Sequence, residues 1–401
     1  MTRRGYVILI SASLVLLLSM GMRQSFGLFQ SSISQSFGIG ITAFSLSLAI
    51  QNLMWGLAQP FAGAIADKFG SGRVIAVGGV FQVLGLLMLA NASSVWELHV
   101  STGIIIGIAG AGTTWAVMLS VIARNVPAAR RTFFLGLGSS IGTGGQILLA
   151  PFNQFTINSF GWISAVLIVA AMIGLTLPLA YVLRGKSTSD DGTQEHTESL
   201  LQTLDRARRH SGYLLLTAGF FVCGFQVMFI SAHLPNYLKT LDMPDWLPGT
   251  AISLIGVTNL AGTMLFGWLG DRYSKKYLLS SLYFLRSVAF AVFLLVPIST
   301  MSVLVFSAAI GFLWLATVPL TNALVAQLFG LRYLATLAGI VFASHQVGSF
   351  VSIWVGGILF DATGSYDLIW QLAIALGVVA AILHMPINEK PVEVPAPQPA
   401  Q

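Results

Sequence analysis

The chain has 401 residues, of which 55% are apolar and only 8% charged, and its mean hydropathy is +0.82 at a formal net charge of +6. A soluble domain carries about a quarter charged residues, so this composition excludes an ordinary water-soluble protein and indicates a membrane protein. Cys223 is the only cysteine, which excludes an internal disulfide and a cysteine-based metal cluster. We expect neither a metal nor a cofactor.

Long apolar stretches recur along the whole chain. A bilayer-spanning helix needs about 20 mostly apolar residues, whereas strands of a membrane barrel alternate over about ten. The continuous runs therefore favour helices. In chain order the predicted spans are 6–29, 42–66, 73–91, 96–122, 131–156, 161–183, 212–237, 247–270, 277–297, 301–328, 333–360 and 365–386. The predicted fold class is an all-α integral membrane protein with twelve transmembrane helices.

The polar residues divide and orient these spans. One segment rich in Ser, Thr, Asp, Glu and Arg lies between the sixth and seventh spans, so we predict an N-terminal six-helix bundle (1–183), a linker (184–211), a C-terminal six-helix bundle (212–386) and a disordered, proline-containing tail (387–401). In this topology seventeen of the 20 Lys and Arg lie on the side that holds both termini and the linker. The positive-inside rule makes that side cytoplasmic, so we expect a multi-pass protein of a bacterial inner membrane.

One short loop occurs twice, each time between two spans. Gly63 and Asp67 end the second span and Gly267 and Asp271 end the eighth, 204 residues later, with basic residues following each pair. Spans five and eleven repeat three glycines at an offset of 203, namely Gly136, Gly145 and Gly161 against Gly339, Gly348 and Gly364. A repeat on this scale indicates two homologous halves.

These features resemble the major facilitator superfamily: twelve spans in two sets of six, with a Gly-x-x-x-Asp-basic loop after the second span. Asn125-Val-Pro-Ala-Ala-Arg-Arg-Thr-Phe-Phe-Leu-Gly136, before span five, and Met22-Arg-Gln-Ser-Phe-Gly-Leu-Phe29, in span one, are similar to the monocarboxylate and oxalate/formate branch. Monocarboxylate carriers have an Asp and an Arg in span eight, where this chain has Asn259 and Thr263. The resemblance implies two bundles that rock around a central cavity, lined by spans one, four, seven and ten with two, five, eight and eleven.

Two arginines lie inside predicted spans, whereas no Asp or Glu lies deep in any of them. A buried Arg costs a few kcal/mol, and without an acidic partner in the membrane the inference is an anionic ligand. The planar guanidinium suits a carboxylate, because it donates two parallel hydrogen bonds. We predict that Arg23 contacts such a ligand; the alternative is that it bonds helix carbonyls or reaches outward. For Arg286, in the ninth span, a packing or gating role competes with ligand contact.

Histidines and neutral polar residues in the spans form a second group. His345, in span eleven, and His233, near the outer end of span seven, are the candidate proton-coupling groups, because imidazole titrates near pH 6.5. Each histidine could instead be neutral and held by a neighbouring helix. The predicted substrate-binding residues, besides Arg23 and His345, are Gln51, Asn52, Trp115, Gln146, Gln226, Asn259 and Asn322. Each polar residue could equally bridge two helices.

The resemblance also implies a cytoplasmic gate, in which carboxylates at helix ends hold neighbouring basic helix ends and then release them. Its members are Gly63, Asp67, Lys68, Arg73, Arg124, Arg130, Gly267, Asp271 and Arg272. Since no Gly-x-x-x-x-Gly-Lys-Ser/Thr sequence occurs, ATP hydrolysis is not expected.

We predict a monomeric secondary transporter, not an enzyme, that moves a small monocarboxylate-like anion by alternating access. Its coupling is proton symport through His345, anion exchange or uniport. The partners we expect are this anion and the lipid bilayer, and no nucleic acid. One alternative is a proton-coupled drug or metabolite exporter, and an alternative of another class is a transport-dead membrane sensor.

Overall fold

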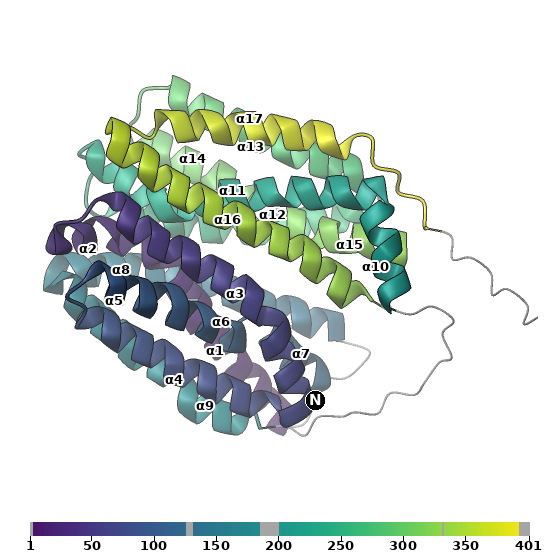
Figure 1. Ribbon diagram of the computed structural model, residues 1–401, viewed down its shortest axis with the longest axis horizontal. Helices are drawn as coiled ribbons and strands as arrows, with labels where there is room; N and C mark the ends of the chain where they lie inside the picture. The colour runs from purple at the N-terminus through teal and green to yellow at the C-terminus, as the bar shows by residue number, and fades with distance from the viewer. Residues whose placement is uncertain (1–2, 126–130, 185–199, 331–332, 393–401) are drawn as a thin grey trace, which may run out of the picture.

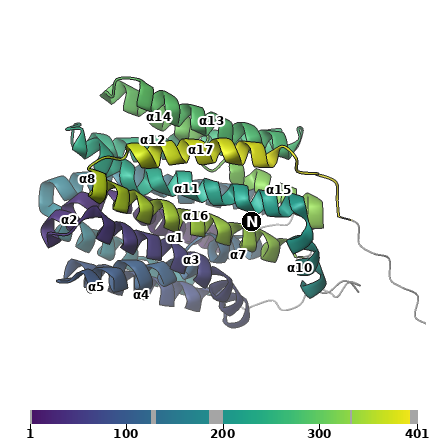
Figure 2. The same ribbon diagram turned by 45° about the horizontal axis from the view of Figure 1, so that its top comes forward.

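The computed structural model describes residues 3–125, 131–184, 200–330 and 333–392, and all regular structure in these ranges is helical. Most long helices run along the long axis of the molecule in two groups that lie side by side (Figures 1 and 2). The first group ends at α9 and the second begins at α11. We call the end where α1 begins and α17 finishes the terminal end, and the opposite end, where α3 begins, the distal end.

The N-terminal half comprises α1 (Arg3–Ser25), η1 (Phe26–Phe29), α2 (Gln30–Phe37), α3 (Ile41–Phe69), α4 (Ser71–Ala90), α5 (Val95–Leu98), the π-helical η2 (His99–Ile105), α6 (Ile106–Thr113), α7 (Trp115–Asn125), α8 (Arg131–Gly174) and α9 (Thr176–Val182). The C-terminal half comprises α10 (Leu200–Arg209), α11 (Ser211–Thr240), α12 (Leu247–Gly270), α13 (Lys275–Leu295), α14 (Thr300–Phe312), α15 (Thr317–Phe329), α16 (Leu334–Thr363) and α17 (Asp367–His384).

Eleven helical stretches in the described residues are long and apolar enough to cross a membrane, and one of them crosses twice. Ser140–Val182 has 43 residues, which is about 64 Å of helix and twice the bilayer core. Gly161 interrupts it in the left-handed region, at φ 78°, and the chain reverses there. Before the turn Asn153 bonds Ser25 near the distal end of α1, and after it Leu183 belongs to the same buried cluster as Ile8, near the start of α1. The predicted all-α fold with twelve spans is thus confirmed.

Each half contains one pair of helices packed backbone to backbone. Gly145 of α8 lies so close to α1 that a Cβ there would overlap the carbonyl oxygen of Leu17, and Gly348 of α16 stands in the same relation to Phe221 of α11. These two glycines belong to the repeat at an offset of 203 residues. The pairs α1–α8 and α11–α16 are therefore equivalent in the two halves.

The halves touch mainly along two seams, α3 with α16 and α8 with α12, and α11 makes a smaller contact with η1 and α2. On the second seam Gln146 Nε2 donates to Ile252 O at 2.7 Å and Ser253 Oγ donates to Ile147 O at 2.8 Å. Toward the terminal end the two groups spread apart (Figure 1). Gly63 and Gly267, near that end of α3 and α12, face open space. The halves are thus closed at the distal end and open at the terminal end.

The linker and tail contain more structure than their composition indicates. Residues 200–209 form α10, which packs on α11. The tail predicted to be disordered from 387 is packed as far as 392: Ile387 is fully buried, Glu389 accepts from Lys276 N at 2.7 Å, and Val392 N donates to Leu328 O at 2.8 Å. Free backbone groups at the ends of α13 and α15 explain this order, because the tail supplies their partners. Residues 393–401 lie outside the described part of the chain.

Candidate functional site

Arg23 lies in the last turn of α1, where its guanidinium faces α3 and the other half. It donates to Asn52 Oδ1 and, at 3.2 Å, to Gln24 Oε1. Its central carbon lies 4.2 Å from the centre of the Trp55 ring, a cation–π distance. Met228 Sδ of α11 lies 3.7 Å from the second terminal nitrogen, so the C-terminal half also reaches this group. Within the described residues Arg23 has no carboxylate partner, and its Nε is buried without a hydrogen bond.

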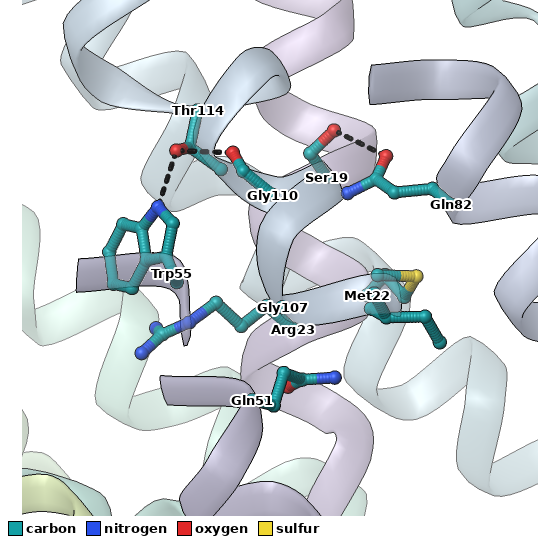
Figure 3. A pocket seen from close by; sticks show the side chains of 10 residues that line it. Ser19, Met22, Arg23, Gln51, Trp55, Gln82, Gly107, Gly110 and Thr114 are labelled. Atoms are coloured by element: carbon teal, nitrogen blue, oxygen red, sulfur yellow. Dashed lines mark hydrogen bonds between the residues drawn. The ribbon is translucent and has the colours of Figure 1, made fainter. Parts of the chain in front are cut away.

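A small pocket lies beside Arg23, between α1, α3, α4 and α6 (Figure 3). Its lining is mostly neutral and in part polar: Ser19, Met22, Arg23, Gln51, Trp55, Gln82, Ile106, Gly107, Gly110 and Thr114. Ser19 Oγ donates to Gln82 Oε1 at 3.4 Å, and Trp55 Nε1 donates to Thr114 Oγ1 at 2.8 Å. The pocket therefore offers one cation, hydroxyl and amide groups, and no acid. Its free volume is about 10 Å³, which is room for one water molecule, so a carboxylate ligand would need the helices around Arg23 to separate.

A chain of polar contacts connects Arg23 with His345 in the other half. Asn52, which accepts from Arg23, also accepts through its backbone oxygen from Gln346 Nε2 at 3.0 Å. Gln346 Oε1 lies 3.0 Å from His345 Nδ1. The imidazole stacks on Phe342 with ring centres 5.7 Å apart and has Ser349 Oγ 3.4 Å away. The structure thus joins two predicted site residues through Asn52 and Gln346, across the α3–α16 seam.

Other predicted residues form bonds between helices. Gln51 Nε2 donates to Thr102 O at 3.0 Å, Gln146 to Ile252 O across the α8–α12 seam, and Gln226 Nε2 to Ala373 O at 2.9 Å. His233 is fully buried between Ile353 O, at 2.8 Å, and the Tyr366 hydroxyl, at 3.2 Å. Trp115 packs on Gly142 of α8, and Asn322 is exposed on α15. Apart from Gln51, the pocket beside Arg23 includes none of these side chains.

Arg286 and Asn259 meet at the break between α14 and α15. Arg286 Nε and one terminal nitrogen donate to Leu313 O, at 3.0 and 2.6 Å, and the same terminal nitrogen donates to Trp314 O. Its other terminal nitrogen lies 3.4 Å from Cys223 Sγ. Asn259 Oδ1 accepts from Leu315 N at 3.0 Å. These side chains satisfy backbone groups that the interrupted helix leaves free.

The predicted gate residues that the structure describes lie at the open terminal end. Arg73 and Asp271 are exposed, and Arg272 stacks on Trp268 with its central carbon 3.8 Å from the ring centre. The side chains of Asp67, Lys68 and Arg124, and all of Arg130, lie outside the described residues. Gly63 and Gly267 face open space, so no partner helix approaches them in this structure.

Four polar contributors to the site were not predicted as site residues. Ser19, Gln82 and Thr114 line the pocket, and Gln346 bonds both Asn52 and His345. Gln82 lies in span three, which the resemblance makes peripheral, so a place in the site was not expected for it. The available signal was the one used for Gln51 and Asn52, an amide side chain within an apolar span.

Comparison with known proteins gives a consistent result. The family model described as Major Facilitator Superfamily matches residues 12–353 and 247–401. Monocarboxylate transporter 13 of Rattus norvegicus is 26% identical over 376 residues, covering 92% of this chain and 85% of that protein. The uncharacterized MFS-type transporter YcxA of Bacillus subtilis (strain 168) is 26% identical over 389 residues, covering 92% of this chain and 91% of that protein.

Among solved structures, a bacterial homolog of the human lysosomal transporter Spinster, in an inward-facing and unoccupied conformation, gives a TM-score of 0.79 at 14% identity. The match covers 96% of this chain and 97% of that one. A D-xylose–proton symporter gives a TM-score of 0.74 at 16% identity, covering 96% and 99%. At these identities the two structures show a shared fold alone.

Proposed function

Because this chain belongs to the major facilitator superfamily, a family of transporters and not of enzymes, we propose that it moves a small organic anion by alternating access. A monocarboxylate is the substrate class that fits best. The observation that carries the proposal is Arg23, a guanidinium at the contact between the halves that has no carboxylate partner in the described residues. The name of the relative in Rattus norvegicus supports the same class.

The donors of Arg23 suit a carboxylate. Asn52 and Gln24 are neutral acceptors, so they orient the guanidinium without cancelling its charge. The Trp55 ring lies against it and fixes its plane. The buried Nε is still free to donate, and a carboxylate that takes Nε and one terminal nitrogen together forms the bidentate pair that Arg favours.

We assign proton coupling to His345. Its imidazole is linked through Gln346 and Asn52 to Arg23, so a change of its charge alters the hydrogen bonds that orient the anion-binding group. The positive-inside rule makes the terminal end cytoplasmic, and the protein then adopts an inward-open state in the inner membrane, with both termini cytoplasmic. In the closed-inside state the predicted gate residues of that end would hold the two halves together.

Transport into proteoliposomes tests the proposal. Labelled lactate, pyruvate, oxalate and formate are offered to wild type, Arg23→Gln and Arg23→Lys, with Arg208→Gln as a control that removes an exposed arginine of α10, outside the site and the predicted gate. We expect saturable uptake that falls about 100-fold in kcat/KM for Arg23→Gln, since charge-assisted hydrogen bonds contribute about 1.5–3 kcal/mol each. Arg23→Lys should recover part of the activity, because it keeps the charge and loses the fork.

Two further arms separate the alternatives. His345→Gln should abolish the dependence of uptake on a pH gradient while keeping exchange of labelled for unlabelled anion. Equal transport by Arg23→Gln and wild type would contradict the assignment of Arg23. Failure of all four anions, together with gradient-driven movement of lipophilic cations, would favour a proton-coupled exporter.

A further inference from the structure

Helices that begin at the distal end differ in how their first turns are capped. α5 and α14, which lie away from the seams, carry caps of their own: Ser94 bonds Glu97 N, and Ser299 bonds Ser302 N. α3 and α12, the seam helices, begin after Gly40 and Trp246 and have no side-chain cap from their own N-cap residue. The first N–H groups of a helix need acceptors, so the seam helices must find them elsewhere.

For α3 the acceptor comes from the other half of the protein. Asp361, in the last turn of α16, accepts from Ile41 N through Oδ1 at 2.9 Å and from Thr42 N through Oδ2 at 2.8 Å. A carboxylate at this position gains both the hydrogen bonds and the favourable end of the helix dipole. The two oxygens together hold the start of one seam helix on the end of the other.

A glycine four residues earlier makes this contact possible. A Cβ on Gly357 would lie 2.8 Å from Ser45 Cβ and 2.9 Å from Thr42 Cα, so only glycine lets α16 approach α3 this closely. The Gly-x-x-x-Asp spacing of 357–361 repeats that of 63–67 and 267–271. The latter two pairs lie at the open terminal end and their glycines face open space, whereas the pair at the closed end is engaged.

We propose that Asp361 is a positioning residue of the transport cycle, the latch of the distal gate. Its carboxylate caps α3 only while the distal end is closed, and opening of that end must break both bonds. The other seam has a weaker counterpart, in which the Asn158 amide donates to Asp245 O at 3.5 Å. At the contact of α11 with α2, Lys239 Nζ adds a single bond to Ser31 Oγ at 2.7 Å. The α3–α16 seam therefore carries a charged cap at the distal end, whereas the bonds described for the α8–α12 seam are between neutral groups. This inference rests on alternating access.

Distance measurement between the halves tests the latch without any substrate. Spin labels are placed at Ser36→Cys and Leu368→Cys, both exposed at the distal end on opposite halves, in a Cys223→Ser background. Double electron–electron resonance then gives the fractions of short and long distances. In Asp361→Ala we expect the ratio of long to short distances to rise roughly fivefold, as expected from loss of a charged helix cap. Asp361→Asn keeps one acceptor and should give a smaller rise.

Matched variants separate a latch from a general loss of structure. Gly357→Ala leaves the Asp361 carboxylate intact, but its added methyl group pushes α16 away from α3. It should therefore give the same long distance between the labels as Asp361→Ala. Glu97→Ala removes an acidic helix cap at the same end but within one half, where the Glu97 carboxylate accepts from Ser93 and Ser94, and should leave the distances unchanged.

Unchanged distances in both Asp361→Ala and Gly357→Ala would overturn the latch, as would an equal shift in Glu97→Ala. Because no anion is added, the latch stands or falls independently of the four-anion transport experiment. A shifted distance in a protein that transports none of the four anions would retain the latch and reject the substrate class.

Discussion

Each half contains one interrupted helix at an equivalent position, and different side chains bond the backbone groups at the two interruptions. α6 ends at Thr113 and α7 begins at Trp115, with Thr114 between them in extended conformation at φ −113° and ψ −162°. Its hydroxyl donates to Gly110 O at 2.7 Å and accepts from Trp55 Nε1 at 2.8 Å, while Gln59 Nε2 donates to Ala111 O at 3.3 Å. Neutral groups from α3 thus satisfy the break in the N-terminal half.

In the C-terminal half a charged side chain, Arg286, bonds the backbone groups at the break. The break between α14 and α15 ends at Thr317, which lies 203 residues after Thr114, the offset of the glycine repeat. There Arg286 donates three hydrogen bonds, two to Leu313 O and one to Trp314 O. The two arginines inside the spans give the same signal in the sequence, yet the guanidinium of Arg286 is taken up by hydrogen bonds to backbone carbonyls. Arg23 is left available for a ligand, because amide, indole and hydroxyl groups hold the other break.

The largest effect that would test this difference is expected from Arg286→Met. Loss of the guanidinium leaves the carbonyls of Leu313 and Trp314 without donors in a buried site, which costs about 1–3 kcal/mol per group. We expect the free energy of unfolding to fall by about 3 kcal/mol, measured by denaturation in detergent micelles. Arg23→Met leaves one buried acceptor, Asn52 Oδ1, without its donor, so it should lower the free energy of unfolding by about 1 kcal/mol while abolishing transport. Equal destabilisation by the two substitutions would refute the division of roles.

A smaller loss is expected from Asn259→Ala. This substitution removes the acceptor of Leu315 N at the same break and leaves one buried N–H group unsatisfied. We expect a loss of about 1–2 kcal/mol in the free energy of unfolding. Asn322→Ala, an exposed amide on α15, is the matched control and should be neutral. If Asn259→Ala were equally neutral but lost transport, Asn259 would bind substrate, as the sequence first indicated.

The smallest effect is expected from Thr114→Val, which keeps the shape of the side chain and removes its hydroxyl. Trp55 Nε1 then loses its acceptor, at a cost of about 1 kcal/mol. Thr114→Ser keeps the hydroxyl and should behave as wild type. Since Trp55 also lies against Arg23, we expect Thr114→Val to raise KM for the anion several-fold. An unchanged KM would show that the N-terminal break and the ligand site are independent.

Sequence patterns were sufficient for the spans and insufficient for the breaks. Hydropathy placed the turn between spans five and six within a few residues of Gly161, because a bilayer-spanning helix must be long and apolar. An interrupted span has the same apolar composition as an intact one, so the residues around Thr114 and Thr317 gave no such signal.

The same reasoning applies to the charged residues. Arg23 was predicted to contact a ligand because acids are missing from the apolar spans, which is a feature of composition, and this contact stays a prediction. The role of Arg286 could not, because its partners are backbone carbonyls, which every residue has. Asp361 was overlooked because it lies at a span end, where an acid is expected to be solvated.

The close contact of Gly145 with α1 also determines which helices must move together. α1 carries Arg23, and α8, to which Gly145 fastens it, forms one of the two seams; likewise Gly348 fastens α11 to the seam helix α16. Because no side chain separates the two backbones, the two helices of each pair cannot slide independently of each other. Movement of α8 at its seam is therefore expected to move α1, the helix that carries Arg23. Under the proposed alternating access, opening of one end of the protein and displacement of the proposed anion would therefore occur together.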